Sequence, residues 1–141
     1  MTYNLTDSSV KLGELNLDKS QFALPKKASI LSARVNYVHE TINGESVSTD
    51  QIAKVTCQIQ DADKVKALKE MGISVEDLKA ITLEIHDNLD KVVKLAKNDG
   101  LIDKTVEPVN PQVRLMWHIS RRGWAGVKLV ATDIKVLGDW P

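Results

Sequence analysis

Hydrophobic and polar residues alternate in two neighbouring stretches of the chain, residues 28–39 and 49–60. A period of two is typical of a strand that buries one face. The dipeptide Asn43-Gly44 lies between the stretches and tolerates the positive φ angles of a tight turn, so we predict an antiparallel hairpin. Its buried face is expected to hold Leu31, Ala33, Val35, Tyr37, Ala53, Val55, Cys57 and Ile59, and its outer face Ile30, Ser32, Arg34, Asn36, Lys54, Thr56, Gln58 and Gln60.

The period changes after residue 60. Residues 61–72 and 87–100 place apolar side chains three and four positions apart and each end in glycine, which predicts two helices. Between them, residues 81–86 alternate again and predict a third strand, with Glu84 and His86 on its exposed face. Residues 105–112 contain two prolines and are predicted to form a loop.

A second alternating pair, residues 113–120 and 124–137, is joined by Arg121, Arg122 and Gly123 and predicts a closing hairpin. Trp117 shares parity with Leu115 and is expected in the core. The buried set changes parity within residues 131–133, which predicts a bulge or bend at that point.

Five strands with two helices predict a mainly β fold, most simply a five-stranded barrel like the OB-fold. An α+β sandwich, such as a ferredoxin-like fold, is the alternative. The domain is expected to span residues 28–141, preceded by an extended arm of residues 1–27 that keeps neither period. Apolar residues of the arm are expected to lie across their own domain or to reach a neighbouring subunit of a homo-oligomer, namely Leu12, Leu15, Leu17 and Phe22.

Composition narrows the class of protein. With 141 residues, 43% of them apolar, the chain has the size and the core of one domain. Lys plus Arg and Asp plus Glu both total 19, so any electrostatic attraction must come from local segregation of charge. A lone Cys57, the lack of a leader pattern and the lack of a long apolar run predict a cytoplasmic protein without a membrane span.

The sequence contains none of the common motifs of catalytic or metal sites. His39, His86 and His118 fall on different predicted strands, and no carboxylate lies at metal-ligand spacing from them. Cys57 falls on an apolar face, as a small buried hydrophobe does. The chain has no Gly-rich phosphate loop, GxSxG or HExxH motif. We therefore expect a binding protein without metal or cofactor rather than an enzyme.

Residues 108–132 contain no Asp or Glu but are rich in cationic and aromatic residues. Phosphates need cations without competing carboxylates, and an exposed ring can stack on an unpaired base. The candidate nucleic-acid-binding residues of this segment are Arg114, His118, Arg121, Arg122, Trp124 and Lys128. The outer face of the first hairpin adds Arg34, Asn36, Lys54 and Gln58. Arg121, Arg122 and the polar residues of the first hairpin would equally suit a solvated surface, and the alternative role of Trp124 is to plug the end of the barrel.

The closing segment VRLMWHISRRGWAGVKLVATDIKVL, after a strand and a helix, carries a resemblance. In this order of elements, residues 28–137 resemble the small OB-fold proteins that bind single-stranded DNA and are encoded by Gram-positive conjugative plasmids and phages, the PrgE-like proteins among them. The resemblance implies sequence-tolerant binding of single-stranded DNA in plasmid transfer or phage DNA processing, with protomers linked through a terminal arm. Unlike typical bacterial single-strand binders, the chain has few aromatic residues and no acidic, Gly-rich tail. A protein-protein adaptor or structural subunit that assembles through the arm is the alternative function.

Overall fold

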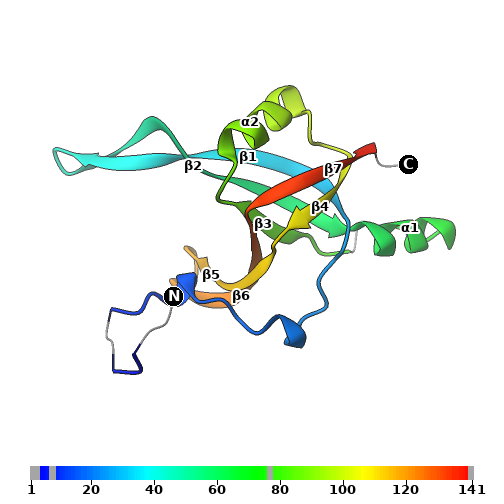
Figure 1. The fold of residues 1–141 in the computed structure, drawn as a ribbon, viewed down its shortest axis with the longest axis horizontal. Coiled ribbons are helices and arrows are strands. Elements are labelled where there is room, and N and C mark those ends of the chain that lie inside the picture. The colour runs from blue at the N-terminus through cyan, green and yellow to red at the C-terminus, as the bar shows by residue number, and fades with distance from the viewer. Residues whose placement is uncertain (1–3, 7–8, 76–77, 140–141) are drawn as a thin grey trace.

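The computed structural model describes residues 4–6, 9–75 and 78–139. Residues 1–3 and 7–8 of the predicted arm, and residues 76–77 and 140–141 of the predicted domain, lie outside the described residues. The described chain is mainly β (Figure 1). Its strands are β1 (Ala28–Ile42), β2 (Glu45–Asp61), β3 (Ile81–Ile85), β4 (Lys104–Val109), β5 (Gln112–His118), β6 (Gly123–Ala131) and β7 (Asp133–Asp139). Its α-helices are α1 (Ala62–Glu70) and α2 (Leu89–Ala96), and its short 3₁₀ helices are η1 (Leu12–Glu14), η2 (Lys19–Gln21) and η3 (Lys97–Asp99).

The predicted first hairpin is confirmed. β1 and β2 pair antiparallel, with Val35 opposite Val55. Asn43 and Gly44 adopt φ angles of 51° and 80°, the left-handed backbone that a two-residue hairpin turn requires. The strands are longer than predicted, and the turn end of the hairpin extends well beyond the body of the molecule (Figure 1).

The predicted faces of β1 are wrong at its start. Ile30 is fully buried, whereas Leu31 is 42% exposed, the reverse of the alternation expected from the sequence. The pairing with β2 shifts between Ile30 and Ser32, so one extra residue reverses the alternation at this point. Tyr37, also expected inside, is exposed on the extending part of the hairpin.

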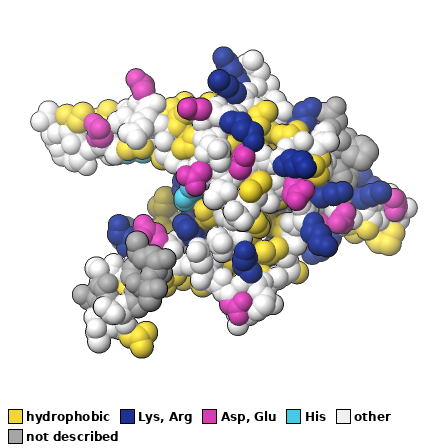
Figure 2. All heavy atoms as spheres, viewed as in Figure 1, with side chains coloured by type: hydrophobic (Ala, Val, Ile, Leu, Met, Phe, Trp, Pro, Cys, Tyr) yellow, Lys and Arg dark blue, Asp and Glu magenta, His cyan; other side chains and the backbone are white. Residues whose placement is uncertain are grey.

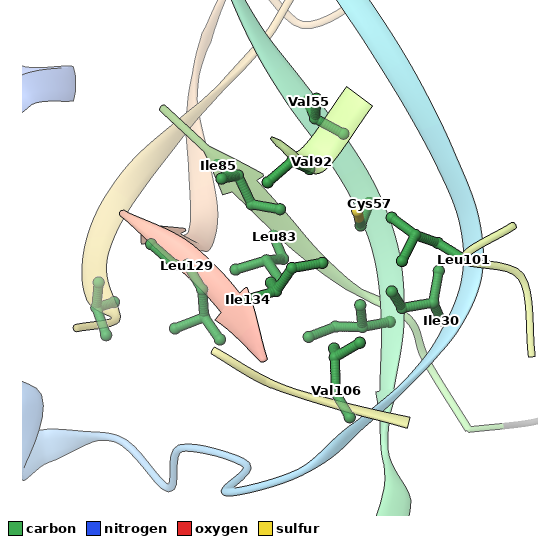
Figure 3. Close-up of a cluster of buried hydrophobic side chains, with 14 residues drawn as sticks. Ile30, Val55, Cys57, Leu83, Ile85, Val92, Leu101, Val106, Leu129 and Ile134 are labelled. Atoms are coloured by element: carbon green, nitrogen blue, oxygen red, sulfur yellow. The ribbon is translucent and has the colours of Figure 1, made fainter. Parts of the chain in front are cut away.

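The described strands form one seven-stranded open sheet in the order β5-β6-β3-β2-β1-β4-β7. β3 and β6 run parallel, and the other neighbouring strands run antiparallel. Side chains from most of the strands and from α2 meet in a single core (Figure 3). Its largest fully buried members include Ile30, Ile59, Leu83, Ile85, Val92, Leu101 and Ile134.

The structure does not show the predicted five-stranded barrel, because β4 forms in the predicted loop and the last predicted strand is divided into β6 and β7. β4 occupies most of the predicted loop at 105–112, and its Pro108 lies opposite Ile134 of β7. A break at Asn110, which has φ 49°, separates β4 from β5. Thr132 separates β6 from β7, which confirms the bend predicted at 131–133. The described chain therefore has seven strands in place of the predicted five, and the mainly β class is confirmed.

Residues 13–24 of the arm lie across their own domain. The Leu17 amide donates to the Val113 carbonyl at 2.8 Å, which adds a bridge to the edge of β5. Leu17, Phe22 and Leu24 pack against the core, while Leu12 is exposed. A role for Leu12, Leu15, Leu17 and Phe22 in an oligomer stays a prediction. No helix within the described residues is long and apolar enough to cross a membrane.

Candidate nucleic-acid interface

The outer faces of β1, β2 and β3 form a continuous polar surface. Arg34 pairs with Thr56 and Asn36 with Lys54, so the four side chains project to one side of the sheet. The Thr56 hydroxyl donates to Asn36 Oδ1 at 2.6 Å. On the same face, Gln58 Nε2 of β2 donates to the hydroxyl of Thr82, its partner on the neighbouring strand β3, at 3.3 Å. Arg34, Asn36, Lys54 and Gln58 thus share a surface, as predicted, but two of them are engaged in cross-strand hydrogen bonds.

Beside this surface lies an open hollow of about 630 Å³. Its cationic side chains come from three strands: Lys54 from β2, Arg114 from β5 and Lys128 from β6. Glu84, His86 and residues 13–16 of the arm complete the lining. The molecule is visibly hollowed on the side between the β1–β2 hairpin and the lobe that holds β5, β6 and the arm (Figure 2). The fold therefore brings together three of the predicted cationic residues from distant parts of the chain.

Glu84 lies at the base of the hollow and is only 6% exposed, so the prediction that it occupies an exposed edge is wrong. The Lys128 ammonium lies 3.0 and 2.9 Å from its two carboxylate oxygens. The Lys54 ammonium lies 3.2 Å from Oε2, and His86 Nε2 lies 3.0 Å from Oε1. The carboxylate thus links side chains of three adjacent strands.

These contacts set the protonation of Glu84. Burial raises the pKa of the carboxyl group, but hydrogen bonds from His86 and Lys128 and the charges of Lys54 and Lys128 outweigh it and lower the pKa from 4.5 to about 2. Glu84 is therefore ionised at neutral pH. With Glu14 also in the lining, three cations face two carboxylates, which leaves a charge of +1 when His86 is neutral.

The arm forms one wall of the hollow. Arg114 Nε donates to Asn16 Oδ1 at 3.0 Å. Gly13 lies so close to the Trp124 ring that a Cβ atom at this position would be 2.9 Å from it. Neither contact carries a signal in the sequence, because both join the arm to strands about a hundred positions later, and no local pattern reports such a pairing.

Two tryptophans lie opposite each other on β5 and β6. The centroids of the Trp117 and Trp124 rings are 5.2 Å apart, and the ring planes are nearly perpendicular, with an angle of 77° between them. Trp124 is 40% exposed, and its stacking role stays a prediction. Trp117 is 49% exposed, so its predicted place in the core is wrong. Trp117 keeps the parity of Val113 and Leu115, but it lies next to the last residue of β5, beside the turn and beyond the buried part of the strand.

The turn end of the β5–β6 hairpin holds other predicted residues. Arg121 and Arg122 are exposed in the turn, where Arg122 has φ 48°. His118 Nε2 lies 2.8 Å from the Ala125 carbonyl, so its ring ties β5 to β6. These three residues are absent from the lining of the hollow, and Arg121 and Arg122 add exposed cations outside it.

Comparison with known proteins adds nothing to this geometry. No protein-family model, curated protein or solved structure matches the chain. Within the described residues, no group of three or more His, Cys, Asp and Glu side chains could hold a metal ion. Cys57 is buried, and burial raises the pKa of its thiol to about 11, which keeps it protonated and unreactive at neutral pH.

Proposed function

We propose that the protein binds single-stranded nucleic acid, preferentially DNA, in the hollow and along the outer surface of β1, β2 and β3. The observation that carries the proposal is the convergence of Lys54, Arg114 and Lys128, from three strands, in one open hollow. Their ammonium and guanidinium groups are suited to the phosphates of a backbone that runs across the strands. Arg121 and Arg122 would continue this contact at the turn.

The exposed tryptophan pair favours a single strand over a duplex. Unpaired bases offer their faces to aromatic rings, whereas stacked and paired bases do not. Trp117 and Trp124 lie on the same hairpin as Arg114 and Lys128, so one strand of DNA could contact rings and cations together. With few aromatic residues, phosphate contacts would supply most of the affinity, and binding would depend steeply on salt.

Strand connectivity supports an OB-fold-like arrangement as part of the proposal. β1, β2 and β3 form a meander, β3 runs parallel to β6, and β4 pairs with β1. Joining β4 to β5 and β6 to β7 would give five bent strands whose ends meet, as in an OB-fold, which binds oligonucleotides on the face of its second and third strands. The sequence resemblance to PrgE-like proteins favours a role in plasmid transfer or phage DNA processing as part of this proposal.

The test is fluorescence anisotropy of a labelled, mixed-sequence single strand and of its duplex, measured at low and moderate salt. We expect preferential binding of the single strand. Arg114→Ala should weaken it several-fold and reduce the salt slope by about 1. Lys66→Ala, on the exposed face of α1, makes the same change of charge away from the hollow and should have little effect. No binding by the wild-type protein at low salt, or equal losses in the two variants, would reject the proposal.

A protein-protein adaptor is the second candidate. Large apolar side chains are exposed near the turn end of β5 and β6, and Ile119 is 85% exposed beside Trp117. Such clusters often mark contacts with another protein. An adaptor predicts assembly without DNA that is lost in Ile119→Ser, a change that leaves the cations in place. Light scattering of both proteins without DNA separates the two functions.

A further inference from the structure

Glu84 of β3 lies between two lysines, which come from the two strands that flank β3 in the sheet. β3 lies between β6 and β2 in the sheet, and these neighbours supply Lys128 and Lys54. Both ammonium groups contact Glu84 Oε2, at 2.9 and 3.2 Å. The carboxylate therefore fixes the relative position of two cations that belong to strands on either side of it.

Each lysine keeps donors for a ligand. An ammonium group has three N–H donors. Lys128 directs two contacts at the carboxylate and Lys54 directs one, which leaves one and two donors respectively. Both side chains also line the hollow. Each ammonium group therefore keeps at least one donor for a phosphate in the hollow that both side chains line.

Burying the Glu84 carboxylate costs free energy, and side-chain packing alone does not explain why a charged residue occupies this position. Burying a charge requires partners that compensate for its lost hydration, and an apolar residue of similar volume often serves stability as well. The negative charge also opposes an incoming phosphate. A favourable contribution to binding must therefore come from the arrangement that it imposes on the lysines.

We propose that Glu84 is a positioning residue for DNA binding, which holds the ammonium groups of Lys54 and Lys128 ready to contact phosphates in the hollow. This inference rests on the proposed function. A free lysine side chain loses considerable rotamer freedom when it binds, and a lysine already held in place loses less. Glu84 acts through the two lysines and need not touch the DNA.

The inference makes a prediction whose sign is opposite to that of simple electrostatics. Glu84→Gln removes a negative charge beside the ligand, so charge alone predicts tighter binding and a steeper salt slope. Loss of positioning predicts weaker binding, by roughly 10-fold for two released lysines. Glu107→Gln, at an exposed position of β4, makes the same change of net charge and is the matched control.

Anisotropy with the same labelled single strand is the experiment, on variants whose melting curves show that they fold. Glu84→Asp is the second variant, because it keeps the charge but shortens the side chain by one methylene group, and we expect it to weaken binding too. In a Lys128→Ala background, Glu84→Gln should have a smaller effect than in the wild type, because one of its partners is already missing.

The outcomes separate the two proposals. If the wild-type protein does not bind the single strand, the proposed function fails. If the wild type binds but Glu84→Gln binds as tightly or more tightly, or Glu84→Asp keeps wild-type affinity, only the positioning role is overturned. Weaker binding by both variants, with Glu107→Gln unchanged, supports it.

Discussion

Asn16 accepts a hydrogen bond at 3.0 Å from Nε of Arg114, a residue 98 positions later in the chain. This contact joins the arm to the cationic hollow, since both residues line it. It orients the Arg114 guanidinium through one nitrogen and leaves the other two for a ligand. The arm is thus part of the candidate interface rather than a separate appendage.

Asn16→Ala should leave Arg114 less well oriented. We expect affinity for the single strand to fall about 2–5-fold, since a less ordered guanidinium loses more freedom on binding. Stability should fall by no more than about 1 kcal/mol, because the lost hydrogen bond is exposed. Anisotropy and thermal melts check the two values. Unchanged affinity would show that the arm does not help to position Arg114.

Gly13→Ala should disturb the contact between the arm and β6. The new Cβ atom would lie 2.9 Å from the Trp124 ring, so one of the two must move. We expect a loss of stability of about 1 kcal/mol and a change in tryptophan emission as the ring becomes more exposed. Gly123→Ala is the matched control, because its Cβ would meet its nearest neighbour at an ordinary 3.8 Å. Identical emission spectra for the two variants would contradict the packing of Gly13 on Trp124.

The depressed pKa of Glu84 predicts a dependence of stability on pH. The pKa falls from 4.5 to about 2 on folding, so the ionised carboxylate stabilises the fold above about pH 4.5, and this contribution is lost as the pH falls towards 2. Its size is about 3 kcal/mol as an upper value. Denaturant melts of the wild type and Glu84→Gln should differ most at neutral pH and converge near pH 2. A constant difference over that range would show that Glu84 does not carry this effect.

Two adjacent residues test the start of β1. Ile30→Ala should destabilise the protein by about 2–4 kcal/mol, because it opens a cavity in the core. Leu31→Ala should cost less than about 1 kcal/mol, because Leu31 is largely exposed. Urea denaturation of the two variants measures the contrast. The alternation of the sequence predicts the reverse order, so this pair of variants decides between the regular strand and the observed bulge.

Local patterns predicted the elements that depend on neighbouring residues. The turn at Asn43-Gly44 and helices α1 and α2 were each predicted from the residues of the segment itself. The bend at Thr132 was visible as a change of parity in the buried set. In each of these cases the decisive contacts lie within a few positions of the chain.

Features that depend on distant strands could not be predicted. Glu84 is buried because Lys54 and Lys128 cover it from neighbouring strands, and its own segment alternates like an exposed edge. Trp117 is exposed because it lies near the turn end of β5, beyond the core, although it keeps the parity of buried Val113. The prolines of residues 105–112 suggested a loop, whereas Pro108 is accommodated opposite Ile134. A bulge or an edge pairing depends on the partner strand, which a single segment does not reveal.

The parallel pairing of β3 with β6 has a consequence for the order of folding. β1 and β2 are joined by a two-residue turn and can pair early, whereas the contact between Glu84 and Lys128 must close a loop of 44 positions. We expect the first hairpin to form in the initial phase and the hollow to be completed in the last one. A chain still being synthesised at residue 120 would hold β3 with its β6 side unpaired, an edge that invites association with other chains until β6 arrives.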